Sequence, residues 1–164
     1  MQPTSAVRVC ARVLATWILA AAAAGCGIPH DPEDSLDRIR QSGVLRAGIT
    51  THLPWTTDSG GPEANAVAAF AQALGARVEW RRGSESELFE ALEKFELDIA
   101  VGGFTADNPA APKLGMTRPY AKADDKKHVV ALAPGENRLI LEFERMLRAH
   151  APAIAARAGA EPIS

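Results

Sequence analysis

The chain has 164 residues, of which 47% are hydrophobic, 23% charged and 5% aromatic, and its formal net charge is −2. This length fits one ordinary domain, and the composition is that of a folded globular protein rather than a disordered tail or a bundle of membrane spans. With 18 basic against 20 acidic residues, the chain has no excess of positive charge for nucleic acid, so we exclude that partner. Two cysteines are too few for a small disulfide-framed protein.

The first 25 residues have the pattern of a secretory signal. Arg8 and Arg12 precede an apolar run over residues 13–24, which is shorter than the ~20 residues that span a bilayer. The run ends in Ala-Ala-Gly before Cys26, a sequence that resembles the lipobox of bacterial lipoproteins. We therefore expect residues 1–25 to be a lipoprotein signal peptide and Cys26 to be acylated. Ordinary cleavage, with secretion into the periplasm, is the alternative.

Short helices and strands alternate after a polar, proline-containing tether over residues 26–34. A helix is expected over residues 35–40 and a strand over 44–50. A turn-rich loop then leads to a helix that begins at Pro62 and is closed by Gly75. Proline at the first helical position loses no needed N–H, and an acidic residue beside it suits the positive end of the helix dipole.

The next two elements repeat this order. Val78 and Trp80 alternate with charged residues, which indicates a strand. Ser84 and Glu87 form a capping box that opens a second helix, and Phe95 is the last residue of its expected apolar face.

Three further elements complete the pattern. A short apolar run over residues 97–101 predicts a buried strand, and another strand is expected over 128–132. The last element is an amphipathic helix that we expect to bend or restart at Pro152. Strands separated by helices predict βαβ units around a mostly parallel sheet, and therefore an α/β fold.

Five segments of this pattern resemble, in order and spacing, those of a known family. They are residues 36–48, 61–75, 86–95, 97–105 and 117–120. The chain is similar here to the family 3 solute-binding proteins, the extracytoplasmic receptors of ABC importers for amino acids and related polar solutes. The resemblance implies a three-layer αβα lobe of the type II periplasmic-binding-protein fold.

Two features depart from the family. The arginine that binds the ligand carboxylate in its amino-acid receptors corresponds here to Ala110, and alanine cannot replace a bidentate guanidinium. The second lobe, which follows the hinge at Tyr120, is replaced by a charged turn over residues 121–127. We therefore expect a single lobe over residues 35–158, followed by a tail over 159–164. One lobe encloses a small solute poorly, so its affinity should be weak unless another protein supplies the second wall.

The candidate binding edge lies at the carboxyl ends of the strands, where open α/β sheets bind ligands. The expected ligand-binding residues at this edge are Trp55, Glu63, Gly103, Phe104, Thr105 and Asp107. Several have a purely structural alternative. Trp55 could cover the edge of the core, Glu63 could stabilise the start of its helix, and Thr105 could cap a strand end, while Asp107 suits a turn.

The resemblance implies an extracytoplasmic solute-binding lipoprotein of the bacterial envelope. Its implied partners are a small polar solute, an ABC permease or a second envelope protein, and the membrane through the lipid. One alternative is an envelope lipoprotein that docks or senses a protein through the exposed edge of its lobe.

A second alternative is an enzyme, because relatives of the fold include cyclohexadienyl dehydratases and proteins fused to lytic transglycosylase domains. The sequence has no nucleophile elbow, phosphate loop or HExxH motif, and its four histidines are scattered. We therefore expect no enzymatic activity, no cofactor and no metal site.

Overall fold

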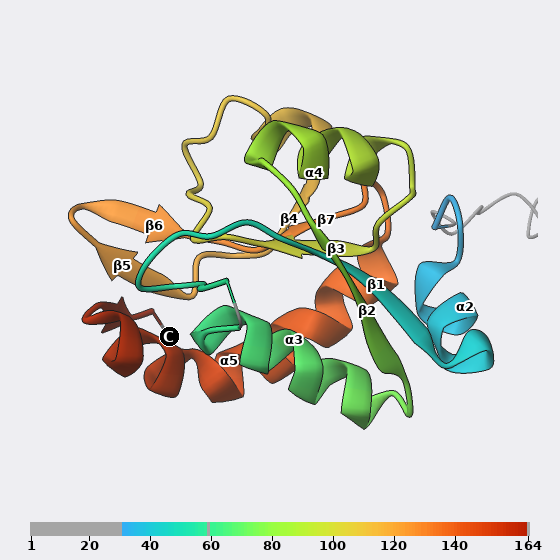
Figure 1. Ribbon diagram of the computed structural model, residues 1–164, viewed down its shortest axis with the longest axis horizontal. Coiled ribbons are helices and arrows are strands. Elements are labelled where there is room, and N and C mark those ends of the chain that lie inside the picture. The colour runs from blue at the N-terminus through green and yellow to red at the C-terminus, as the bar shows by residue number, and fades with distance from the viewer. Residues whose placement is uncertain (1–30, 59, 164) are drawn as a thin grey trace, which may run out of the picture. The chain divides into compact units, whose positions relative to one another are not determined.

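A mixed five-stranded sheet forms the centre of the computed structural model, which describes residues 31–58 and 60–163. The strand order is β2–β1–β3–β7–β4 (Figure 1). The strands are β1 (Val44–Ile49), β2 (Arg77–Arg82), β3 (Ile99–Val101), β4 (Gly115–Met116) and β7 (Ala131–Leu132). Strand β1 pairs in parallel with both β2 and β3, whereas β7 runs antiparallel to β3 and β4. The predicted α/β fold with a mostly parallel sheet is confirmed.

Helices cover both faces of this sheet. They are α2 (Ser35–Ser42), α3 (Pro62–Ala73), α4 (Glu85–Glu93) and α5 (Asn137–Ala158), with a short 3₁₀ helix, η2 (Ala111–Lys113). Figure 1 shows α4 on one side of the sheet and α3 and α5 on the other. Two clusters of buried residues correspond to these two interfaces, the larger with α2, α3 and α5 and the smaller with α4. The expected three-layer αβα lobe is therefore present.

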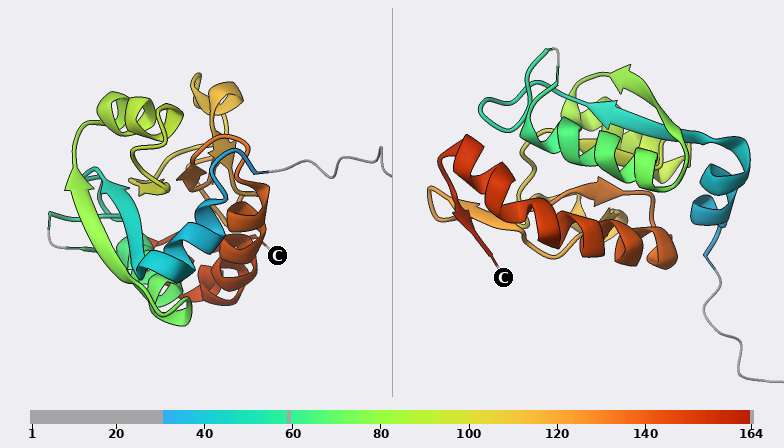
Figure 2. Two further views of the ribbon diagram at one scale, coloured as in Figure 1. Left: turned by 90° about the vertical axis from the view of Figure 1, so that its right-hand side faces the viewer. Right: turned by 90° about the horizontal axis from the view of Figure 1, so that it is seen from below.

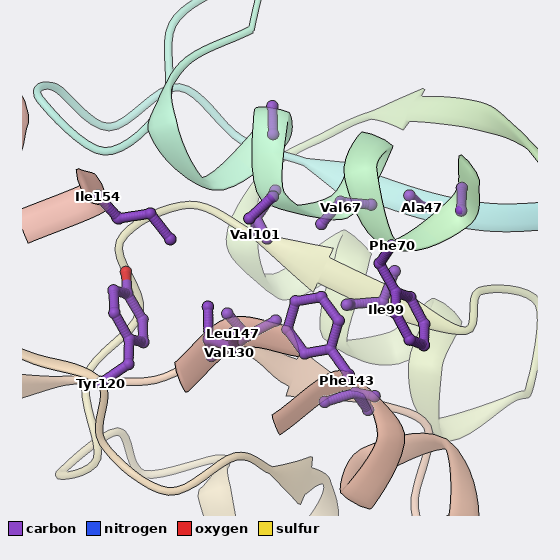
Figure 3. Packing of buried hydrophobic residues seen from close by; sticks show 14 of the residues in the cluster. Ala47, Val67, Phe70, Ile99, Val101, Tyr120, Val130, Phe143, Leu147 and Ile154 are labelled. Atoms are coloured by element: carbon purple, nitrogen blue, oxygen red, sulfur yellow. The ribbon is translucent and has the colours of Figure 1, made fainter. Parts of the chain in front are cut away.

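The larger cluster is held together by aromatic and aliphatic side chains from helices and strands (Figure 3). Phe70 of α3 meets Phe143 of α5 edge to face, with ring centroids 5.1 Å apart. Both side chains are buried. The helical spacing of apolar residues in the sequence thus brings α3 and α5 together on one face of the sheet.

Local signals explain where the helices begin and end. The capping box is present at α4, where the Ser84 hydroxyl accepts from the Glu87 N–H and the Glu87 carboxylate accepts from the Ser84 N–H. The expectation that Phe95 belongs to this helix is wrong, because its φ of 56° lies in the left-handed region and follows the helix end. Helix α5 continues through Pro152 instead of restarting there.

A second, three-stranded sheet stands where the resemblance places the second lobe. Strands β5 (Ala121–Ala123) and β6 (Lys126–His128) form an antiparallel hairpin, and β8 (Glu161–Pro162) pairs with β5. Asp124 and Asp125 make the turn with φ values of 46° and 62°, a conformation that aspartate tolerates. The strand expected over residues 128–132 is therefore two strands, since β6 belongs to this sheet and β7 to the larger one.

The N-terminal predictions lie largely outside the described residues. This holds for the signal peptide over residues 1–25, for Cys26 and for the tether as far as residue 30. The last tether residues contact the lobe, because the Asp31 carboxylate accepts from the backbone N–H groups of Asn137 and Arg138 at the start of α5. Within residues 31–58 and 60–163, no helix has the length and apolarity needed to cross a membrane.

Candidate functional site

A cavity of about 610 Å³ opens at the carboxyl ends of β1 and β3. Loops after both strands, the first residue of α4, the hairpin β5–β6 and the end of α5 contribute to its wall. The lining residues are His52, Leu53, Pro54, Trp55, Glu85, Gly103, Phe104, Thr105, Asn108, Ala123, Asp124, Lys126, His128, Ala158 and Gly159. The cavity thus lies at the sheet edge where the sequence places the candidate binding residues.

Trp55 lies at the base of this cavity with only 3% of its surface exposed. Its indole stacks on the imidazole of His128, with ring centroids 3.9 Å apart and 29° between the planes. It also meets the ring of Tyr120 edge to face at 6.0 Å. The indole is therefore in contact with other side chains of the protein. This arrangement matches the structural alternative for Trp55, in which the side chain covers the edge of the core.

Glu63 does not line the cavity but lies behind it, 1% exposed. Its Oε2 accepts from the N–H groups of Gly102 and Gly103, both at 2.9 Å, and its Oε1 accepts from the hydroxyl of Tyr120. Burial raises the pKa of the Glu63 carboxyl above its ordinary value, against the lowering effect of these hydrogen bonds. Glu63 thus fixes the loop after β3 to α3 and to the start of β5.

The loop after β3 carries three more of the candidate residues. Gly103 has a φ of 65° and lines the cavity. The ring of Phe104 packs against Phe89, with centroids 4.8 Å apart, in the cluster under α4. Thr105 forms a β-bridge with His128 and faces the same cavity. Of these three, Thr105 offers a side-chain polar group to the cavity.

Asp107 is exposed and does not belong to the cavity wall. Its pKa is lowered chiefly by a hydrogen bond from Thr105. The neighbouring Asn108 does line the cavity, and its amide donates to the Glu85 carboxylate at 2.9 Å. Ala110, which takes the place of the family's arginine, packs instead against the cluster under α4.

Sequence reasoning did not select several polar residues of the wall. Glu85 lies between the capping-box residues Ser84 and Glu87, and Asp124 and Lys126 lie in the charged turn over residues 121–127. The Nδ1–H of His128 donates to the carbonyl of Gly103 at 3.2 Å, and burial lowers the pKa of the imidazole. The hairpin β5–β6 brings Asp124, Lys126 and His128 to the cavity, whereas Glu85 comes from the start of α4. The signal for the hairpin in the sequence is the short charged turn over residues 121–127.

Two imidazoles flank the loop after β3, since His52 also contacts a carbonyl there, that of Gly102, at 2.9 Å from Nδ1. Across residues 31–58 and 60–163, no group of three or more His, Cys, Asp or Glu side chains is placed to hold a metal ion. The polar wall therefore consists of separate hydrogen-bonding and charged groups around an open cavity.

Among curated proteins, the chain is similar to the membrane-bound lytic murein transglycosylases F. It is 32% identical over 99 residues to that of Vibrio cholerae and 33% identical over 86 residues to that of Aliivibrio fischeri. These matches cover 57% and 49% of this chain but only 19% and 17% of the relatives' lengths. No family model matches the chain.

Among solved structures, the chain is similar to amino-acid-binding proteins. The arginine-bound domain 1 of TmArgBP aligns with a TM-score of 0.60 at 18% identity, covering 69% of this chain and 98% of that one. An L-arginine-bound ABC transporter substrate-binding protein of Streptococcus pneumoniae has a TM-score of 0.63 at 11% identity, with coverages of 78% and 99%. At these identities the likeness concerns the fold.

The expectation that the chain has no enzymatic activity is contradicted by these comparisons. The curated relatives are lytic transglycosylases. A further structural neighbour is an ancestral amino-acid-binding protein described as a precursor of cyclohexadienyl dehydratase, with a TM-score of 0.63 at 14% identity and coverages of 76% and 99%. Missing motifs were a weak basis for the prediction, because one fold can carry both binding and catalysis.

The five resembling segments, the αβα layers and these neighbours agree with one another. The chain has the single-lobe periplasmic-binding-protein fold of the family 3 solute-binding proteins.

Proposed function

We propose that the chain is a solute-binding lobe that takes a small polar solute with a positively charged group into the cavity at the ends of β1 and β3. The observation that carries this proposal is the polar, open wall of that cavity on a lobe whose structural neighbours bind arginine. A volume of about 610 Å³ falls in the range of small-molecule sites.

The charges of the wall favour a cation. Glu85 and Asp124 supply two carboxylates, whereas Lys126 is the one lysine or arginine among the described lining residues. Burial lowers the pKa of His128, so this imidazole of the wall adds no positive charge near pH 7. The wall therefore carries a net negative charge, and the absence of a guanidinium at Ala110 removes the usual partner of a ligand carboxylate.

The cavity is open to one side, because no second lobe closes over it within the part of the chain that the structure describes. A single wall leaves part of a solute hydrated, so binding is weak unless a partner covers the opening. Such a partner is an ABC permease or another protein of the bacterial envelope, where an acylated Cys26 would hold the lobe. Exposed Leu53, at the rim of the cavity with 69% of its surface accessible, is the apolar contact available to that partner.

The test is a binding titration of the full chain with L-arginine, L-lysine, putrescine and L-glutamate, followed by calorimetry and by thermal unfolding. We expect the three cations to bind and glutamate not to bind. A ligand at 100 times its dissociation constant adds about 2.7 kcal/mol to the free energy of unfolding. Thr105→Trp should fill the cavity and abolish binding, whereas the matched change Gln41→Trp, on the exposed surface of α2, should not. Binding that survives Thr105→Trp would remove the cavity as the site.

The match to lytic murein transglycosylases favours a second candidate function. The lobe would then bind a fragment of murein and serve a murein-cleaving system of the envelope. The observation in favour is the identity of 32% over 99 residues, which is higher than that of the aligned arginine-binding neighbours. The same titration with soluble murein peptides and disaccharides distinguishes the two, because binding of a murein fragment without binding of any of the three cations would favour this candidate.

A further inference from the structure

Strand β2 is an unusually exposed edge. It is the terminal strand of the five-stranded sheet and pairs only with β1 among the described residues. Figure 2 shows it on the outside of the sheet. All of its residues except Val78 are exposed, including Trp80 at 40%. A six-residue edge strand with an exposed indole is a template for pairing with a further strand.

The hydrogen bonds to β1 show which backbone groups of β2 are free for such pairing. The N–H of Arg77 donates to the carbonyl of Gly43, and that of Gly83 donates to the carbonyl of Ile49. These odd-numbered positions therefore face β1, and the strand period of two turns the N–H and C=O groups of Val78, Trp80 and Arg82 away from it. An added strand would thus pair with these three residues.

The side chains of β2 allow it to pair with a second copy of itself. In an antiparallel arrangement centred on Trp80, the two Trp80 residues face each other and Val78 faces the partner's Arg82. Glu79 then lies opposite the partner's Arg81 at a non-hydrogen-bonded position, where side chains are closest. The two-fold symmetry forms this ion pair twice, once on each side of Trp80.

Other registers are less favourable. Sliding the strand by two residues in one direction places Glu79 against Glu79, and sliding it in the other places Arg81 against Arg81. Like charges directly opposite each other destabilise a strand pair. A slide of four residues leaves half of the strand or less paired. The charge pattern therefore selects the register centred on Trp80.

We propose that two copies of this chain associate through β2, in an antiparallel two-fold pair centred on Trp80, to form one continuous sheet. Within one copy, Glu79 contacts Arg77 at 2.7 Å and Arg81 contacts Glu96 at 2.8 Å. Because these exposed pairs are weak, they do not prevent Glu79 and Arg81 from interacting with the second copy. In the dimer, Arg77, Glu79, the partner's Arg81 and the partner's Glu96 then form a row of charges of alternating sign across the interface. This inference is independent of the proposed solute.

The test is sedimentation velocity of the full chain over a range of concentrations, in a mild detergent that shields the apolar stretch at residues 13–24. We expect a monomer–dimer equilibrium. Glu79→Arg and Arg81→Glu should each raise the dissociation constant at least about tenfold, because each places like charges opposite each other twice. An equimolar mixture of the two variants should dimerise again, since two arginines of one variant then face two glutamates of the other. The control, Glu142→Arg on α5, should leave the equilibrium unchanged.

Each outcome decides the proposal. A monomer at every concentration overturns it, and so does a dimer that the single reversals leave unaffected. Failure of the mixture to associate would also exclude this register, provided that both variants show the circular dichroism of the parent. Slower amide hydrogen exchange of residues 77–82 at high concentration is the second expected result, because pairing protects the N–H groups of Val78, Trp80 and Arg82.

Discussion

The indole of Trp55 stacks on the imidazole of His128, with 3.9 Å between the ring centroids and 29° between the ring planes. Trp55 comes from the loop after β1 and His128 from the end of β6, so this contact joins the main sheet to the hairpin that replaces a second lobe. Tyr120, just before β5, meets the same indole edge to face. The base of the cavity is therefore an aromatic cluster built from segments that are far apart in the sequence.

Replacing Trp55 with alanine should destabilise the lobe strongly. The side chain is buried at 3% exposure, and truncating a buried tryptophan typically costs about 3–5 kcal/mol. Thermal or urea unfolding measures the loss. Leu53→Ala, two positions away and 69% exposed, should change the free energy of unfolding by no more than about 0.5 kcal/mol. Equal effects of the two changes would contradict the assignment of Trp55 to the core.

Gly103→Ala should lower the free energy of unfolding by more than the left-handed backbone conformation of Gly103 alone explains. A Cβ at Gly103 would lie 2.5 Å from Cδ1 of Trp55 and 3.0 Å from Nδ1 of His52. Gly75 has a similar φ, 71° against 65°, but a Cβ there meets nothing within 4 Å. Gly75→Ala therefore reports the left-handed strain alone, roughly 1–2 kcal/mol. The larger loss expected for Gly103→Ala, measured by urea unfolding, is the cost of displacing Trp55.

The carboxyl of Glu63 should make the stability of the lobe depend on pH in a defined direction. Burial raises its pKa in the folded state above the ordinary value of 4.5, so the folded state holds this proton more tightly than the unfolded one. The resulting stabilisation is complete below pH 4.5 and is lost as the pH rises through the folded-state pKa. The hydrogen bonds from Tyr120, Gly103 and Gly102 oppose this rise, and a smaller Coulombic contribution from His52 also lowers the pKa of Glu63.

Glu63→Gln isolates this effect, because glutamine cannot ionise but has the size and the hydrogen-bonding pattern of the protonated carboxyl: one oxygen that accepts from the Gly102 and Gly103 N–H groups, and one group that donates to the Tyr120 oxygen. We expect the free energy of unfolding of the variant, relative to that of the parent, to increase as the pH rises above 4.5. Glu63→Ala should lose about 2–5 kcal/mol below pH 4.5, and less as the pH rises, since it leaves the N–H groups of Gly102 and Gly103 and the hydroxyl of Tyr120 without their acceptor. A difference between Glu63→Gln and the parent that stays constant with pH would refute the raised pKa.

Local sequence signals predicted most of the fold but little of the site. The capping box at Ser84 and Glu87, and Pro62 at the first position of α3, act within one helical turn, so the sequence shows them directly. The partners of Glu63 lie 39, 40 and 57 positions away. No local pattern distinguishes such a carboxylate from one that merely stabilises a helix start.

The prediction of a single strand over residues 128–132 was wrong for a similar reason. The run is apolar after its first residue, and periodicity does not show that His128 pairs with β5 whereas Ala131 pairs with β3. The division follows from the hairpin, whose tight turn at Asp124 and Asp125 brings His128 back against Trp55. That contact depends on the tertiary structure, so the role of His128 in the cavity could not be predicted.

Removing the carboxylate of Asp98 should destabilise the lobe far more than removing an exposed carboxylate. It is fully buried, and its carboxylate accepts from the backbone N–H of Arg46 at 2.9 Å, from the Arg46 guanidinium at 2.6 Å and from the Arg38 guanidinium. These contacts tie β1 and α2 to the residue before β3. Removing one partner of a buried ion pair costs about 3–5 kcal/mol.

The expected loss for Asp98→Ala lies near the lower end of that range, about 3 kcal/mol, because Arg38 and Arg46 are 32% and 31% exposed and can regain water. Asp98→Asn should recover only part of it, since the amide keeps one acceptor but neither ion pair. Glu90→Ala, which breaks the exposed pair with Lys94 on α4, should have little or no measurable effect on unfolding. Urea unfolding of the three variants ranks them. A loss for Asp98→Ala as small as that for Glu90→Ala would mean that burial contributes nothing to the Arg38–Asp98–Arg46 cluster.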